Sequence, residues 1–112
     1  MVLLIAGYAL SKAQALDWCK DHGIDPPQSC ITACVYRWLR GRGIPTLLHA
    51  CSYDGRDIFL FTTHRKTALD QTRTHYKPIT EDERALRIKE QLGINNVEFV
   101  TVSGAYRMWG VE

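Results

Sequence analysis

The sequence predicts a small α+β protein, and three observations support this prediction. Short apolar segments typical of strands stand near the start, in the middle and near the end of the chain. Between them lie longer segments with the apolar period of helices, bounded by capping residues. A chain of 112 residues can bury a core of its own, so we expect residues 1–112 to form a single domain.

The first strand and the first helix are predicted at residues 2–8 and 11–23. The segment VLLIAGY is short and apolar, as in a buried strand. Ser11 and Gln14 are spaced to form a capping box, in which each side chain bonds to the backbone amide of the other. Gly23 suits the position that follows a helix.

A second helix is predicted to run from Asp25 to about Arg42. Asp25 is a good capping residue, and Pro26 would occupy the first helical position, where no hydrogen-bond donor is lost. The apolar positions that follow the helical period are Ile31, Cys34, Val35, Trp38 and Leu39.

A β-hairpin is predicted next. The strand segments TLLHACSY and RDIFLFTTH flank Asp54 and Gly55, a dipeptide favoured in two-residue type I′ turns. Residues 64–78 are polar, show no clear period and are predicted to form a long loop.

The third helix and the last strand complete the pattern. Thr80 and Glu83 are spaced as a capping box, and Gly93 marks the end of this helix. The segment VEFVTVS at 97–103 is the last predicted strand. The tail at 105–112 either adds a short fifth strand or packs across the sheet.

These elements give the order βααββαβ, which is the ferredoxin-like βαββαβ pattern with its first crossover doubled into a helical hairpin. Right-handed crossovers place the first and third strands in the centre of a four-stranded antiparallel sheet. The helices are expected to cover one face of this sheet.

The other face of the sheet raises the question of what covers it. In the third strand, Ile58 and Leu60 point one way, while Phe59 and Phe61 point the other and would lie on the open face. A second copy stacked sheet on sheet is the favoured cover, which predicts a homodimer. The alternatives are the tail, through Tyr106 and Trp109, and a ligand or unpaired RNA bases.

Composition favours a cytoplasmic protein that is not bound to a membrane. The net charge of +2 is too small to indicate nucleic acid by itself, and no apolar run is long enough for a membrane span. The first ten residues lack the features of a signal peptide. Four cysteines are too few for a disulfide scaffold, so we expect reduced thiols.

The segment CKDHGIDPPQSCITAC holds Cys19, His22, Cys30 and Cys34, whose spacing on two helices is compatible with zinc. The favoured interpretation is that these residues belong to the helical core, because free cysteine is among the most buried residue types. We therefore expect no metal and no cofactor.

Two sets of residues are candidates for function. The possible catalytic residues combine imidazoles with a neighbouring thiol: His49, Cys51, His64 and His75. A possible anion-binding surface combines the end of the second helix with the basic 64–78 segment: Arg37, Arg40, Arg65, Lys66, Arg73 and Lys77.

The sequence therefore predicts a homodimeric binding module for a small molecule or a partner. The alternatives are a protein that binds RNA or phosphate and a small ribonuclease-like or cyclase-like enzyme that uses the histidines of the 64–78 segment. A bell-shaped pH profile that is lost on a single histidine substitution would distinguish the enzyme from the binding module.

Overall fold

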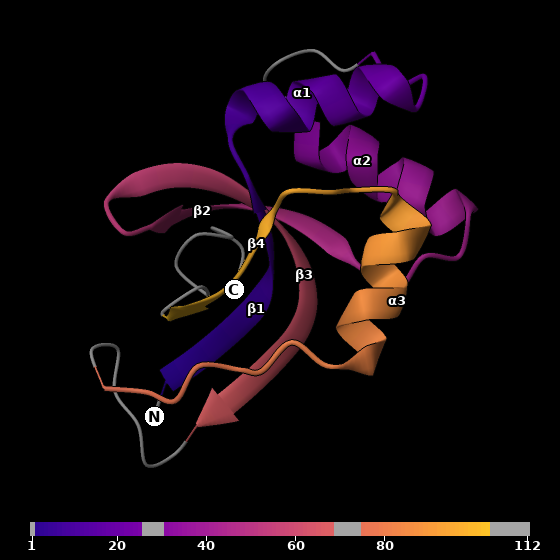
Figure 1. Ribbon diagram of the computed structural model, residues 1–112. Helices are drawn as coiled ribbons and strands as arrows, with labels where there is room; N and C mark the ends of the chain where they lie inside the picture. Colours follow the sequence, from indigo (N-terminus) through magenta and orange to yellow (C-terminus); the bar gives the residue numbers. More distant parts are fainter. Residues whose placement is uncertain (1, 26–30, 69–74, 104–112) are drawn as a thin grey trace.

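The computed structural model describes residues 2–25, 31–68 and 75–103. In chain order its elements are β1 (Val2–Leu10), α1 (Lys12–Asp21), α2 (Ile31–Gly41), β2 (Leu47–Tyr53), β3 (Arg56–Ala68), α3 (Glu83–Leu92) and β4 (Glu98–Ser103) (Figure 1). The fold is α+β, as predicted. The C-terminal tail and the predicted first turn of the second helix lie outside the described residues.

The four strands form one open antiparallel sheet in the order β2-β3-β1-β4. The central strands are β1, which pairs with β3 and β4, and β3, which also pairs with β2. The β2–β3 hairpin turns at Asp54 and Gly55, whose φ angles are both positive (51° and 73°). A type I′ turn requires two positive φ angles, so the predicted hairpin turn is confirmed.

All three helices pack against one face of this sheet (Figure 1). The sheet contributes Tyr8, Leu10, Leu48 and Phe61 to the core, and the helices contribute Ala15, Trp18, Cys19, Ile31, Val35, Leu39, Ala85, Ile88 and Leu92. The indole N–H of Trp18 donates to the carbonyl oxygen of Leu92 (2.9 Å), which ties α1 to the end of α3. The Tyr8 hydroxyl donates to the Glu81 carboxylate just before α3 (2.7 Å).

The second face of the sheet carries a separate apolar cluster, and its members differ from those we expected. Ile5, Cys51, Ile58, Leu60, Val100 and Val102 form this cluster and are between 0 and 7% exposed in the single chain. The prediction that Phe59 and Phe61 lie on the open face is wrong, because both pack into the core under the helices. The two phenylalanines therefore lie on the helix side of the sheet and do not provide an open-face surface for a second copy or for stacked bases.

A β-bulge in β3 changes which side chains face the helices. Ala6 pairs with His64, but the next residue, Gly7, pairs with Thr62, so Thr63 is the extra residue. Thr62 and His64 would share a face in a regular strand, because they are two residues apart. The bulge instead leaves Thr62 on the second face and turns His64 towards α3.

The end of the third strand and the start of the third helix differ from the predicted boundaries. β3 continues to Ala68, so Arg65 and Lys66 belong to a strand rather than to the predicted loop. The third helix begins later than predicted, and its N-cap is Asp82, whose side chain accepts from the amide of Ala85. The capping box of the first helix is confirmed at both of its hydrogen bonds.

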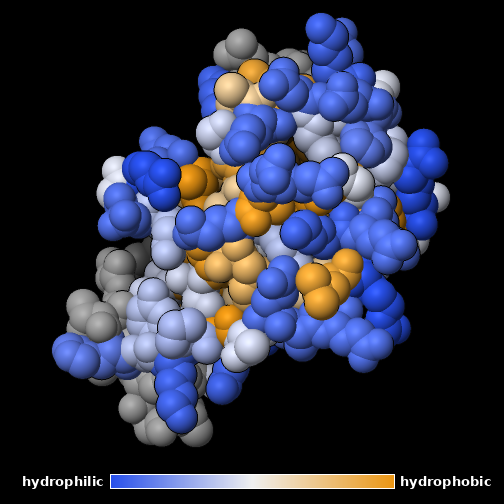
Figure 2. Space-filling model, viewed as in Figure 1, coloured by the Kyte–Doolittle hydropathy of each residue, from blue (hydrophilic) through white to orange (hydrophobic). Residues whose placement is uncertain are grey.

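The surface seen in Figure 2 is mostly hydrophilic over the helices, and hydrophobic side chains show as separate patches. Large hydrophobic residues that are exposed within the described segments are Tyr36, Leu47 and Leu86. None of the helices in these segments combines the length and the apolar character that crossing a membrane would need.

Candidate functional site

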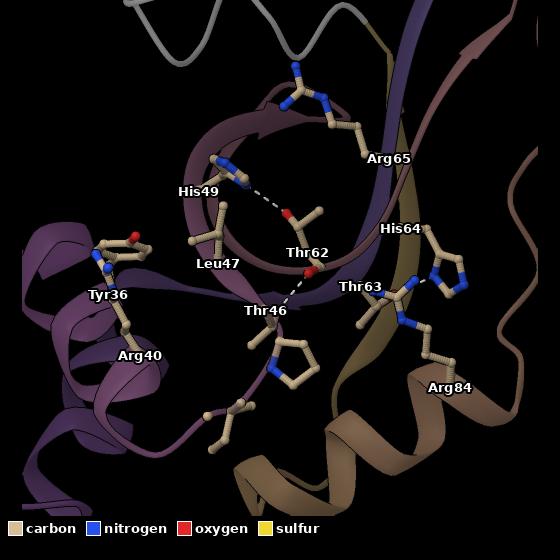
Figure 3. Close-up of a pocket in the computed structure, with 13 residues that line it drawn as sticks. Tyr36, Arg40, Thr46, Leu47, His49, Thr62, Thr63, His64, Arg65 and Arg84 are labelled. Atoms are coloured by element: carbon tan, nitrogen blue, oxygen red, sulfur yellow. Dashed lines mark hydrogen bonds between the residues drawn. The ribbon is translucent and has the colours of Figure 1, made fainter.

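A basic cavity of about 620 Å³ lies beside the edge strand β2, where the end of α2, the start of β2, the bulged part of β3 and the start of α3 meet (Figure 3). These parts meet because α2 leads into β2, and antiparallel pairing places Thr62, in the middle of β3, opposite Leu47 at the start of β2. The cavity is lined by Tyr36, Arg40, Gly43, Ile44, Pro45, Thr46, Leu47, His49, Thr62, Thr63, His64, Arg65 and Arg84.

Three arginines from three elements are among the residues that line this cavity. Arg40 comes from α2, Arg65 from β3 and Arg84 from α3 (Figure 3). The described residues that line the cavity include no aspartate and no glutamate. Within the described part of the chain, no ion pair joins Arg40 or Arg84 to a carboxylate. The described residues that line the cavity therefore carry positive charges and no negative one.

Threonine hydroxyls form the floor of the basic cavity and hold its backbone in place. The Thr46 hydroxyl donates to the carbonyl oxygen of Thr62 (2.6 Å), and this bond joins the start of β2 to β3. The hydroxyl of Thr63, the bulge residue, donates to the carbonyl oxygen of Ala6 (3.3 Å). These two hydrogen bonds therefore connect the bulged part of β3 to the start of β2 on one side and to β1 on the other.

His49 is a neutral imidazole at the wall of the cavity. Its Nδ1 atom lies 2.7 Å from the Thr62 hydroxyl, with which it shares a hydrogen bond. Burial and the positive charge of Arg65 lower the pKa of His49 to about 4. A negative charge bound in the cavity would oppose the effect of Arg65, because it would favour the imidazolium form.

The pKa of His49 predicts a loss of stability in weak acid. Between pH 6.5 and about 4, the unfolded chain takes up a proton at His49 that the folded chain does not, so the free energy of unfolding falls as the pH drops. We expect a loss on the order of 2 kcal/mol. Urea denaturation across this range should show a shallower decline for His49→Gln than for the natural protein. Identical pH profiles would contradict the assignment of a neutral, half-buried His49.

His64 is held at both ring nitrogens. Its Nε2–H donates to the Asp82 carboxylate (2.8 Å), and its Nδ1 lies 2.7 Å from the Thr63 hydroxyl. The Ala85 amide and then the His64 side chain lower the pKa of Asp82, which therefore stays ionised. Asp82 links the N-terminus of α3 to the bulge, so His64 serves to position the cavity wall.

The structure brings four of the predicted residues into one cavity and separates the others. Those that line it are His49, His64, Arg40 and Arg65; the described residues that do not line it are Arg37, Lys66, Cys51, His75 and Lys77. Arg73, Tyr106, Trp109 and Cys30 lie outside the described residues. Sequence reasoning missed Arg84 and Tyr36. The four-residue spacing that puts Tyr36 on the same helix face as Arg40 is a signal that could have indicated Tyr36.

Cys51 and Cys19 lie in apolar surroundings, and Cys34 is partly buried. Burial raises the pKa of the Cys51 thiol to about 11, so it stays protonated at neutral pH. Cys19 is buried, and burial and then the neighbouring Cys34 raise the pKa of its thiol. His22 stacks on Trp18 (4.2 Å between centroids) and donates to the Trp18 carbonyl oxygen. Among the described residues, no group of three or more potential ligands could hold a metal ion.

Comparisons of the chain with protein-family models, with curated proteins and with solved structures found no match. The side chains of the basic cavity are thus the basis for inferring a ligand. They offer guanidinium groups, imidazoles and hydroxyls in a hollow the size of a small-molecule site. This set of donors suits an anion that carries several oxygen atoms.

Proposed function

We propose that this protein binds a small phosphorylated or similarly anionic molecule in the basic cavity. The observation that carries the proposal is that Arg40, Arg65 and Arg84 line one hollow whose described lining has no carboxylate. We also propose that the fold is ferredoxin-like, with a doubled first crossover. The element order and the central position of β1 and β3 support this assignment.

Arginine is well suited to such a ligand. Its planar guanidinium offers two parallel N–H donors to two oxygens of one phosphate, and it remains charged at all physiological pH values. Arginines from three separate elements surround a ligand, whereas arginines along one helix would form an exposed stripe. A bound anion would also relieve the repulsion between these like charges.

The geometry supports binding better than turnover. Both ring nitrogens of His64 are engaged, and the Cys51 thiol is protonated and does not line the cavity. His75, another candidate acid or base, does not line the cavity either.

Titration calorimetry with inorganic pyrophosphate tests this proposal. Arg40→Gln and Arg84→Gln should each weaken binding about tenfold or more, because each removes a charge-assisted contact. Arg37→Gln on α2 and Arg87→Gln on α3 are matched controls, because they remove the same charge from positions that do not line the cavity. They should change the affinity by no more than about twofold.

The dependence on salt adds a second criterion. Affinity should fall as ionic strength rises, because the attraction is electrostatic and partly exposed to solvent. Equal losses in the cavity variants and in the controls would show a diffuse charge effect rather than a site. Absence of binding at low salt would refute the proposed function.

A further inference from the structure

We propose that the ligand of the basic cavity is a nucleoside monophosphate, with its phosphate on the arginines and its base stacked on Tyr36. This inference rests on the proposed function and specifies the class of molecule. It is based on the uncharged, apolar side of the cavity, which a phosphate group alone would not contact.

One wall of the basic cavity is apolar and exposed. Tyr36 is 42% exposed and Leu47 is 41% exposed, and both line the cavity together with Ile44 and Pro45. Two of the three large hydrophobic residues that are exposed in the described segments therefore meet at this site. The third, Leu86, lies elsewhere on α3. Exposed apolar side chains gathered beside convergent polar groups are typical of a ligand-binding site.

The aromatic ring and a cation stand side by side on α2. Arg40 follows Tyr36 by four residues, so the two side chains share one face of the helix. Figure 3 shows them together on one side of the cavity, while Arg84 enters beside His64 from α3. A planar group stacked on Tyr36 would therefore lie next to Arg40, and Arg84 would stand on the opposite side of the cavity.

The size of the cavity also indicates an organic ligand. Its volume of about 620 Å³ greatly exceeds that of an inorganic phosphate, which would leave the apolar wall in contact with water. A base, a ribose and a phosphate together fill such a hollow more completely. Aromatic rings accept the face of any base, so stacking on Tyr36 accounts for binding without specifying which base is preferred.

Competing ligands on the full chain test this inference. We would titrate the protein with AMP, ribose 5-phosphate and adenosine. AMP should bind about tenfold more tightly than ribose 5-phosphate, since base stacking contributes roughly this factor. Tyr36→Ala should abolish the difference and leave the affinity for ribose 5-phosphate unchanged. Tyr36→Phe should restore it, because phenylalanine offers the same ring face.

Leu86→Ala is the matched control, because it removes another exposed apolar side chain that does not line the cavity. It should leave all three affinities unchanged. Equal affinities for AMP and ribose 5-phosphate would overturn the nucleotide assignment and leave the proposed anion site intact. Failure of both compounds and of pyrophosphate to bind would refute the anion site itself. Binding of a single-stranded oligonucleotide far more tightly than AMP would also overturn the assignment to a mononucleotide.

Discussion

Replacing Gly7 with alanine is expected to lower the free energy of unfolding by more than about 3 kcal/mol. A Cβ atom at this position would lie 1.9 Å from the carbonyl oxygen of Phe61, 2.7 Å from its carbonyl carbon and 2.9 Å from the Cα of Thr62. All three are backbone atoms of the neighbouring central strand, so no side-chain rotation relieves the clash. β1 and β3 would have to separate beside the bulge that shapes the cavity.

Urea denaturation of Gly7→Ala measures this effect, and Gly41→Ala is its control. A Cβ on Gly41 would meet nothing within 4 Å, and alanine favours a helix, so the control should be as stable as the natural protein or slightly more so. If Gly7→Ala were equally stable, β1 and β3 would not approach each other as described, and the bulge would lose its structural basis.

Phe61→Ala is expected to cost about 3–5 kcal/mol in the free energy of unfolding. The Phe61 side chain is 1% exposed, and its ring lies 5.0 Å from that of Trp18 in an edge-to-face contact. Removing it leaves a cavity between the sheet and α1 that the rigid packing cannot fill.

Phe59→Ala is the natural comparison, because Phe59 is only partly buried against the same core. It should cost less, about 1–2 kcal/mol. Chemical denaturation of both variants measures the difference. A cost below about 1 kcal/mol for Phe61→Ala would mean that Phe61 faces solvent, as on the open sheet face that we first predicted.

Local signals in the sequence predicted most of the secondary structure but not the roles of the two sheet faces. The helix cap at Ser11 and the turn at Asp54 and Gly55 depend on neighbouring residues alone, and both were predicted. Alternation correctly separated Ile58 from Phe59 but could not show which face the helices cover, because both faces are apolar. That choice depends on contacts with α1, far away in the sequence.

The candidate site could be predicted only in part, for a similar reason. Arg40, Arg65 and the two histidines were identified by their charge and spacing, whereas Tyr36 resembles any exposed residue of an amphipathic helix. The sequence of β3 contains no glycine or proline that would predict the bulge at Thr63, yet the bulge decides which way the His64 side chain points. Convergence of side chains from three elements is a property of the tertiary fold.

The most direct test of the anion site is a titration of the ¹⁵N-labelled protein with AMP, followed by amide chemical shifts. We predict that the largest changes fall on residues 36–49, 62–65 and 84, which surround the basic cavity, while the second sheet face around Val100 and Val102 stays unchanged. Changes centred elsewhere would contradict the assignment of this cavity as the binding site, and so would the absence of changes with both millimolar AMP and millimolar pyrophosphate.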